Sequence, residues 1–432
     1  MKKKLIFCVC IVLCAVFCMS TIPFSAFTFD CDVNVTSATV LVANLNTDTF
    51  VYEKKSNRAR YMSYLSSIMT YIVARSNVSD LSTKVPIKKD VLDSIEQPDN
   101  SIDIYTGKTL TVKDLCHYIL LTDSTDACYV LADYVSGGNI DDFVALMNKK
   151  AVELSCTKTK FSSPACVNNS SQYTTCKDMY KIIKCALDTP DYTDIASTPS
   201  YIPDGYKSKK LAIGNTNSLI RANSPYYFKH VKNGKYAQDD ISKGNIVAVS
   251  EYSDVKYVCI IFGAQRNSEH NAFTETKQLL TWAYTQLGNK QLFAKDTVLQ
   301  SVTANTAWGE TSIDLVTSDD VIRTLPADYD ETKLKYKFTS KSVKLPVFEG
   351  QNMGTAQVYY ENKPFDNVDL VAGSSHGITM LGDLANFVGA MFNSTLTKPT
   401  EQETQETKPP TEKPTKTKPT QTETQAQTQE QQ

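Results

Sequence analysis

The chain of 432 residues has few histidines and no excess of positive charge. Only four His are present, so a His-rich metal centre is not expected. Lys and Arg number 45 against 47 Asp and Glu, and this balance lacks the basic excess that nucleic-acid-binding proteins use to neutralise phosphates. We therefore expect no nucleic-acid partner, no metal and no cofactor.

A long apolar run occurs only at the N-terminus. Lys2, Lys3 and Lys4 precede an uncharged stretch from Leu5 to Met19. This pattern is typical of an export signal and is too short for a comfortable membrane-spanning helix. We predict a signal peptide over residues 1–26 and an exported protein, either extracellular or associated with the wall or membrane. An uncleaved signal that anchors the chain in the membrane is the alternative.

Cysteine pairs with metal-binding spacing are also absent. No C-x-x-C string occurs, which argues against a zinc site. Eight cysteines remain after the signal, and we expect them to be mainly buried thiols with one or two disulfides at most: Cys31, Cys116, Cys128, Cys156, Cys166, Cys176, Cys185 and Cys259.

The C-terminal end lacks apolar residues. From Thr397 to Gln432 the sequence consists of Thr, Pro, Glu, Gln and Lys, with Ala426 as its one apolar residue. Such a segment cannot bury enough surface to offset chain entropy, so residues 397–432 are predicted to be a disordered stalk. The apolar stretch before it, residues 383–396, predicts a short helix and a second candidate membrane contact.

Residues 30–290 combine strand and helix patterns. Alternating apolar positions predict a β-hairpin at its start, and two apolar runs predict strands near its end. Helical periodicity lies between and after them. The block is therefore predicted to be α+β, with strands at Thr39–Leu45, Phe50–Tyr52, Asn245–Val249 and Tyr257–Phe262, and helices at Ser63–Val73, Val112–Tyr134, Ile140–Leu154 and Glu275–Leu287.

Residues 295–380 show strand alternation without a helical pattern. Apolar and lysine residues alternate from Lys333 to Phe338, which predicts a half-buried strand with a basic outer face. Val343, Leu345 and Val347 alternate in the same way, and Gln357–Tyr360 predicts another strand. This block is expected to be a small antiparallel β domain.

Several strings resemble the serine-type D-alanyl-D-alanine carboxypeptidases, the low-molecular-mass penicillin-binding proteins. They include Tyr52-Glu53-Lys54, Ile68-Met69-Thr70, Thr111–Leu115, Leu131-Ala132-Asp133 and Ile260–Ala264. The resemblance implies a β-lactamase-like fold, in which an antiparallel sheet is flanked by helices beside an all-helical lobe. It also implies removal of the terminal D-alanine from peptidoglycan stem peptides through an acyl-serine intermediate.

The chain departs from this family at its first catalytic motif. Such enzymes carry Ser-x-x-Lys, Ser-x-Asn and Lys-Thr-Gly motifs. Alignment on Ile68-Met69-Thr70 places Tyr64 at the nucleophile and Ser67 at the lysine. A phenol is too bulky for this acyl transfer, and the hydroxyl of Ser67 cannot act as a base.

The second and third motifs are degenerate as well. The resemblance places Asp123, Ser124 and Thr125 at the second motif, with Ser124-Thr125-Asp126 as an alternative register. Lys232, Asn233 and Gly234 stand where the third motif is expected. In this interpretation Lys232 attracts the carboxylate of the substrate, and Gly234 lets the substrate lie along the strand.

These departures favour a catalytically impaired member of the family. We expect it to bind a peptidoglycan stem peptide or another wall component without turning it over, because loss of the acyl acceptor removes the covalent step. The alternative is an active carboxypeptidase in which Ser63 or Ser66 serves as an atypical nucleophile.

Overall fold

The computed structural model describes residues 29–95, 106–166, 171–204, 212–265, 271–306, 309–340, 343–377 and 406–407. Contacts divide the chain into two compact units. The first comprises Ala26–Leu292 with Ile322–Tyr329, and the second comprises Phe293–Val321 and the described residues from Asp330 onward. Within these ranges no helix has the length and apolar character needed to cross a membrane. The predicted signal peptide and the predicted helix over 383–396 lie outside the described residues.

A five-stranded antiparallel sheet forms the centre of the first unit. Its strands lie in the order β2-β1-β11-β10-β9. The predicted N-terminal hairpin and the two later strands are confirmed, with bounds β1 (Thr39–Asn44), β2 (Thr49–Lys54), β9 (Val231–Asp239), β10 (Lys243–Tyr252) and β11 (Val255–Ala264). Because β1 pairs with β11, the first strand of the block lies beside its last.

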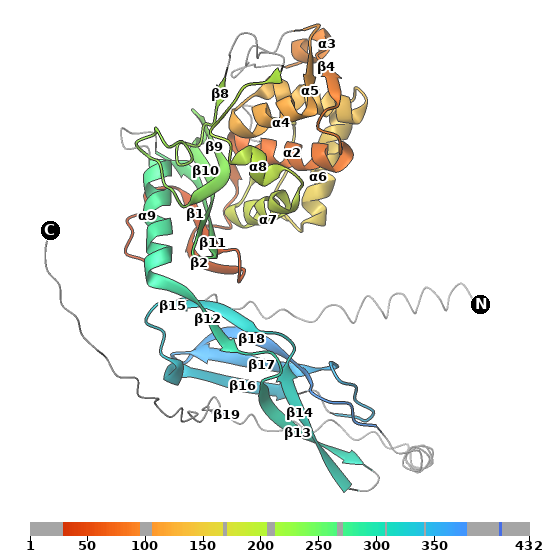
Figure 1. The fold of residues 1–432 in the computed structure, drawn as a ribbon, viewed down its shortest axis with the longest axis vertical. Coiled ribbons are helices and arrows are strands. Elements are labelled where there is room, and N and C mark those ends of the chain that lie inside the picture. The colour runs from red at the N-terminus through yellow and green to blue at the C-terminus, as the bar shows by residue number, and fades with distance from the viewer. Residues whose placement is uncertain are drawn as a thin grey trace, which may run out of the picture. The chain divides into compact units, whose positions relative to one another are not determined.

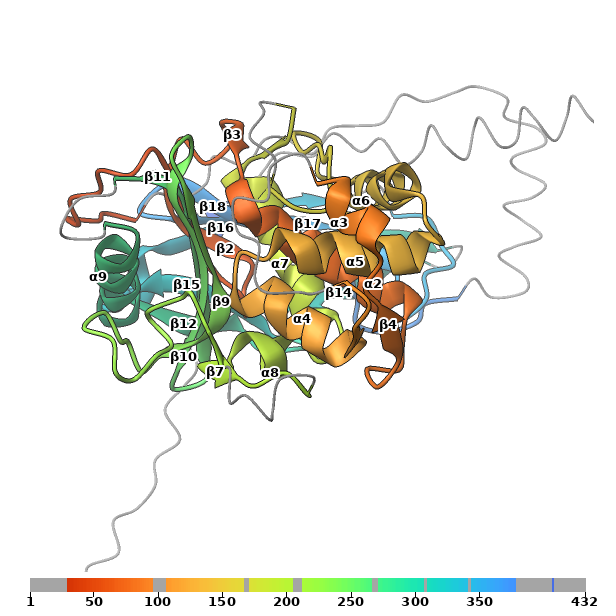
Figure 2. The same ribbon diagram turned by 90° about the horizontal axis from the view of Figure 1, so that it is seen from above.

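The two faces of this sheet bury separate apolar clusters. Leu41 and Ala43 of β1 point into one cluster, whereas Val40 and Val42 point into the other, as strand alternation requires. Helix α9 (Asn271–Gln286) covers one face, and the remaining helices gather on the other (Figures 1 and 2). These helices are α2 (Ser67–Asn77), α3 (Lys89–Asp93), α4 (Val112–Leu121), α5 (Thr125–Ser136), α6 (Ile140–Glu153), α7 (Cys176–Asp188) and α8 (Tyr192–Ala196).

The continuous helix predicted over Val112–Tyr134 is wrong. The chain instead forms α4 and α5, with Thr122, Asp123 and Ser124 between them. Ser124 has an extended backbone, and its side chain accepts a hydrogen bond from the N–H of Ala127, so it is the N-cap of a new helix. The break places two helix ends at one point beside the sheet.

Short segments complete the first unit. A 3-10 turn, η1 (Ser63–Ser66), leads directly into α2. Three two-stranded ribbons pair β3 (Arg60–Tyr61) with β6 (Tyr173–Thr174), β4 (Lys84–Pro86) with β5 (Thr109–Thr111), and β7 (Ser200–Tyr201) with β8 (Ile213–Gly214). A fourth ribbon pairs β12 (Leu287–Phe293) with β15 (Val321–Pro326).

The second unit is an antiparallel β domain, as predicted. Its strand order is β13-β14-β18-β17-β16-β19, with bounds β13 (Val298–Thr306), β14 (Gly309–Thr317), β16 (Leu334–Ser340), β17 (Asn352–Tyr360), β18 (Lys363–Ala372) and β19 (Glu406–Thr407); the 3-10 turn η3 (Glu331–Lys333) precedes β16. Within the predicted tail, the structure describes only β19, which pairs with β16.

The strand expected from Val343, Leu345 and Val347 does not form. Residues 343–346 have no strand pairing, and Val347 makes one isolated bridge with His376. Pro346 lies within this stretch and has no N–H group to donate to a neighbouring strand. Alternation of apolar residues alone was therefore not enough to form a strand here.

Candidate functional site

The C-terminal end of α4 brings α2 and β9 together. The last carbonyl groups of a helix have no partner within the helix. Here the carbonyl of Ile119 accepts two hydrogen bonds, from Ser67 Oγ at 3.2 Å and from Lys235 Nζ at 3.1 Å. The first donor stands at the start of α2 and the second in the middle of β9. One backbone oxygen therefore joins the sheet to two helices.

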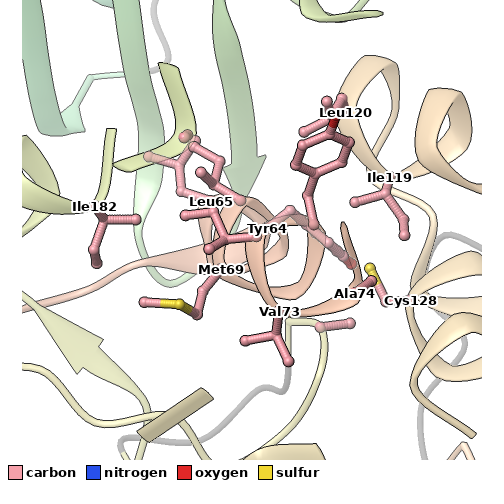
Figure 3. Close-up of a cluster of buried hydrophobic side chains, with 14 of the residues drawn as sticks. Tyr64, Leu65, Met69, Val73, Ala74, Ile119, Leu120, Cys128 and Ile182 are labelled. Atoms are coloured by element: carbon pink, nitrogen blue, oxygen red, sulfur yellow. The ribbon is translucent and has the colours of Figure 1, made fainter. Parts of the chain in front are cut away.

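Ser67 and Tyr64, predicted at the first motif, are both buried. Ser67 Oγ also donates to the carbonyl of Tyr64 at 2.7 Å, so both contacts of this hydroxyl are with main-chain oxygens. The Tyr64 side chain is 6% exposed and belongs to the apolar cluster that includes Leu120 and Cys128 (Figure 3). The position expected for a nucleophile therefore holds a residue packed into the core.

Lys235 carries the buried positive charge of this site. Its side chain is 1% exposed, and its Nζ lies 3.3 Å from Asp123 Oδ1. The ammonium group also donates to the carbonyl of Thr122, in addition to that of Ile119. These neighbours supply a counter-charge and two acceptors, which a buried ammonium requires.

Asp123 is placed at the junction of α4 and α5 and faces β9. Burial raises the pKa of its carboxyl, while the charge of Lys235 acts in the opposite direction. The backbone N–H of Gln238 also donates to this carboxyl. The residue predicted at the second motif is thus held by two residues of one strand, as half of a buried ion pair.

Ser124 and Thr125, the other two residues predicted at the second motif, differ in their hydrogen bonding. Ser124 uses its hydroxyl to cap α5, accepting from the N–H of Ala127 at 3.2 Å. Asp126, rather than Asp123, is the acid in the first turn of α5. Thr125 is buried, and its Oγ1 has no hydrogen-bond partner among the described residues. A buried hydroxyl of this kind is suited to a water or ligand contact.

Lys232, predicted as the cation of the site, does not point into it. Val249 pairs with Asn233 and Ser250 pairs with Val231, so Lys232 is the extra residue of a β-bulge. Its side chain is exposed. The pKa of His230 is lowered mainly by burial, and then by the positive charges of Lys229 and Lys232. The expectation for Lys232 is corrected: Lys235, three residues later, contacts Asp123.

The structure gives a reason for the glycine at Gly234 that the sequence interpretation missed. Its φ is +132°, and a Cβ at this position would lie 2.1 Å from the carbonyl oxygen of Val247 on β10. The close approach of the neighbouring strand is thus enough by itself to require glycine here. Asn233 is 3% exposed, and its Oδ1 has no hydrogen-bond partner in the described part of the chain.

The thiols closest to these charges are unsuited to nucleophilic chemistry. Burial raises the pKa of Cys166 to about 11 and that of Cys128 to about 12. Cys166 Sγ lies 2.8 Å from the hydroxyl of Tyr61, and the nearby charges of Asp239 and Asp123 also disfavour a thiolate. A protonated thiol is a weak nucleophile. Across the described ranges, no group of three His, Cys, Asp or Glu residues is arranged to hold a metal.

Lys235 is the residue of the site that sequence reasoning missed. The Lys-x-Gly string drew attention to Lys232, which stands next to the beginning of β9. The position of Lys235 in the middle of a strand, between residues that are buried, was the better signal, because such a lysine must have partners in the interior. Lys235 shares its strand face with Ala237, which packs in the cluster on the helical side.

This fold and site define a penicillin-recognising hydrolase architecture: a sheet between one long helix and a helical group, with a lysine of the edge strand facing the start of α2. A family model described as D-alanyl-D-alanine carboxypeptidase matches residues 26–266, and one described as the C-terminal domain of penicillin-binding protein 5 matches residues 288–377. The chain belongs to the D-alanyl-D-alanine carboxypeptidase family, as the sequence strings predicted.

Named relatives agree with this assignment. D-alanyl-D-alanine carboxypeptidase DacF of Bacillus subtilis is 24% identical over 313 residues, which cover 72% of this chain and 78% of the relative. DacC of Escherichia coli is 25% identical, covering 71% and 76%. Penicillin-binding protein 5 of Haemophilus influenzae has a similar structure, with a TM-score of 0.68 at 19% identity, over 81% of this chain and 100% of that one.

The two lysines of β9 give a matched test of the site. Lys235→Met leaves Asp123 buried without its counter-charge, and we expect it to lower the free energy of unfolding by about 3–5 kcal/mol. Lys232→Met removes an exposed charge and should change it by no more than about 0.5 kcal/mol. Urea unfolding followed by circular dichroism measures both. Equal effects of the two substitutions would contradict the assignment of Lys235 as the buried partner of Asp123.

Proposed function

We propose that this protein is an exported, catalytically impaired member of the carboxypeptidase family that acts at the cell wall by binding a peptidoglycan stem peptide or another wall component. The family assignment gives the wall as the place of action. The charged run and apolar stretch before residue 26 support export. One observation supports the loss of catalysis. The polar side chains at the site donate their hydrogen bonds to backbone carbonyl groups of the protein itself.

Acyl transfer to a serine needs a base that accepts the hydroxyl proton. At the position of that base, Ser67 is a hydroxyl donor to two carbonyls and cannot accept a proton at neutral pH. The nearby amine, Lys235, is held by Ile119, Thr122 and Asp123. All of these partners belong to the protein itself, so in this proposal the amine holds the α4–α5 junction and takes no part in catalysis.

The contacts of Lys235 also support a different register for the third motif. With Lys235 as the motif lysine, Tyr236 and Ala237 stand at the threonine and glycine positions of Lys-Thr-Gly. The ring of Tyr236 lies 4.5 Å, centroid to centroid, from that of Phe273, which belongs to the α9 side of the sheet. Only the lysine of the motif then remains, and all three motifs are degenerate.

An active enzyme with an atypical serine is the second candidate, and one observation favours it. Of the two candidate serines, both buried, Ser63 lies against the thiol of Cys166, whereas Ser66 Oγ has no hydrogen-bond partner among the described residues. It lies one residue before the start of α2. No base among the described residues accepts a hydrogen bond from it, so acylation through this serine would be slow.

Fluorescent penicillin distinguishes these two functions. We expect the purified protein to form no covalent adduct that survives denaturation, because a serine without a base is not acylated. Gel fluorescence after prolonged incubation measures this, with heat-denatured protein as the control. An adduct that is lost in Ser66→Ala would instead establish the atypical enzyme.

Restoring the first two motifs should restore acylation. In the variant Tyr64→Ser, Ser67→Lys, Asp123→Ser, Thr125→Asn, the new lysine shares the Ile119 carbonyl region with Lys235. Burial and the neighbouring positive charge should lower the pKa of this amine and favour the neutral form that acts as base. We expect a penicillin adduct with this variant and none with Tyr64→Ser alone. A folded fourfold variant without adduct would show that the shape of the cleft, and not only its chemistry, has changed.

The ion pair should also limit binding of the original substrate. A peptide that ends in D-alanyl-D-alanine carries a carboxylate. Asp123 repels this group, and Lys235, which could attract it, is already paired with Asp123. We expect a dissociation constant of about 1 mM or weaker, improved about tenfold by Asp123→Ser. Calorimetric titration measures both, with Asp142→Ser as the control for loss of an exposed acid. Micromolar binding that Asp123→Ser leaves unchanged would place the peptide elsewhere.

A further inference from the structure

A hollow lies on the opposite face of the sheet from Lys235. It has a volume of about 270 Å³ and is lined by Ser218, Arg221, Asn223, Ser224, Pro225, Tyr226 and Phe273. Phe273 comes from the first turn of α9, and its ring contacts those of Tyr226 and Tyr236. The hollow thus belongs to the α9 side of the sheet, whereas Lys235 faces the helical group.

The loop that forms this hollow is held in place at both ends. Leu219 and Ile220 are buried in the apolar cluster under α9. The N–H of Phe228 donates to the carbonyl of Leu219 at 3.0 Å and closes the loop. Within it, the N–H of Ser224 donates to the carbonyl of Arg221 at 2.9 Å. These contacts fix the walls before any ligand arrives, as is usual for binding sites.

Arg221 is the charged group of the hollow, and its hydrogen-bonding capacity is not used up. One terminal nitrogen donates to Ser218 Oγ at 2.9 Å. Its Nε is buried and has no hydrogen-bond partner among the described residues. A guanidinium has five N–H donors in a planar fork that matches a carboxylate. The N–H at Nε can therefore donate to an acceptor outside the chain, and a negatively charged one fits best.

The surroundings favour an anion that carries an apolar group. Lys229 and Lys277 are exposed close to this loop, the latter 5.8 Å from the ring of Phe228. Neither these lysines nor Arg221 forms an ion pair within the described ranges. The acid on the same helix turn, Glu275, is turned to Thr36, from which it accepts at 2.6 Å and 2.8 Å. Pro225, Tyr226 and Phe273 offer the apolar contacts.

We propose that this hollow is a binding site for a small carboxylate with an apolar side group, of the size of one amino acid. Arg221 holds the carboxylate through its guanidinium, and the rings of Tyr226 and Phe273 contact the apolar group. The volume lies just below the range of drug-sized ligand sites, which sets the size of the ligand. The same chemistry is offered by a free acid and by the C-terminal residue of a peptide.

Ligand-detected NMR and calorimetry on the full-length protein test the site with three probes. N-acetyl-leucine presents a peptide-like terminus, 4-methylpentanoate presents the same side chain as a free acid, and N-acetyl-leucinamide lacks the charge. We expect the acids to bind with a dissociation constant of about 1 mM, weakening as salt is added, and the amide to bind at least about tenfold less well. Preference for N-acetyl-leucine over 4-methylpentanoate supports a peptide terminus as ligand, and equal binding supports a free acid.

Two arginine substitutions complete the test. Arg221→Gln should weaken binding of the acids at least about tenfold, while Arg221→Lys keeps the charge and should weaken it less. Arg58→Gln removes an exposed arginine outside the loop and should leave the affinity unchanged. Equal affinity for acid and amide, no effect of Arg221→Gln in a protein with unchanged melting temperature, or no binding of either acid would each overturn the proposal.

Discussion

The arrangement of the first unit depends on a buried ammonium group at the end of a helix. Lys235 donates to the carbonyls of Ile119 and Thr122, and so caps α4 from the neighbouring strand. The C-terminal end of a helix carries partial negative charge, which favours a cation there. Asp123 adds a full counter-charge at 3.3 Å. Removing either charge would leave the other one buried, so the pair fixes β9 against the junction of α4 and α5.

In our proposal, the same contacts explain how the scaffold of the family is kept while its chemistry is lost. Three elements still converge on one point: the start of α2, the α4–α5 junction and β9. Their side chains now satisfy the backbone, since Ser67 and Lys235 both donate to the carbonyl of Ile119. An ammonium group that stabilises a helix end could hold a substrate only by giving up its hydrogen bonds to that helix end. In our proposal, stability of the site and loss of turnover therefore have one physical cause.

Much of the fold was predictable because its patterns are local. Alternation identified the β1–β2 hairpin and strands β10 and β11, and helical spacing identified α6. The junction at Asp123 was missed because apolar residues with helical spacing lie on both sides of it, although the polar run Thr122–Asp126 and the N-cap chemistry of Ser124 mark the break. The strand expected around Leu345 failed because alternation carries no information about a partner strand.

The contacts of the candidate site were harder to predict than the positions that the resemblance gave for it. The resemblance located Tyr64, Ser67 and Asp123, and the structure places them around the end of α4. It did not distinguish Lys232 from Lys235, because that choice depends on a β-bulge between β9 and β10. A bulge changes which side chains share a face without leaving a signature in a short motif. The partners of a buried charge are long-range contacts, which a single sequence does not encode locally.

The two faces of the central sheet hold their charged groups in different states. On the helical side, the charge of Lys235 is balanced within the protein by Asp123 and two carbonyls. On the α9 side, Arg221 has a buried Nε without a partner among the described residues, in a hollow with preformed walls. A balanced charge contributes to stability, whereas an unbalanced one gains free energy only when a ligand arrives. By this criterion the pair on the helical side of the sheet is a structural anchor, and the opposite face is the better candidate for recognising an anion.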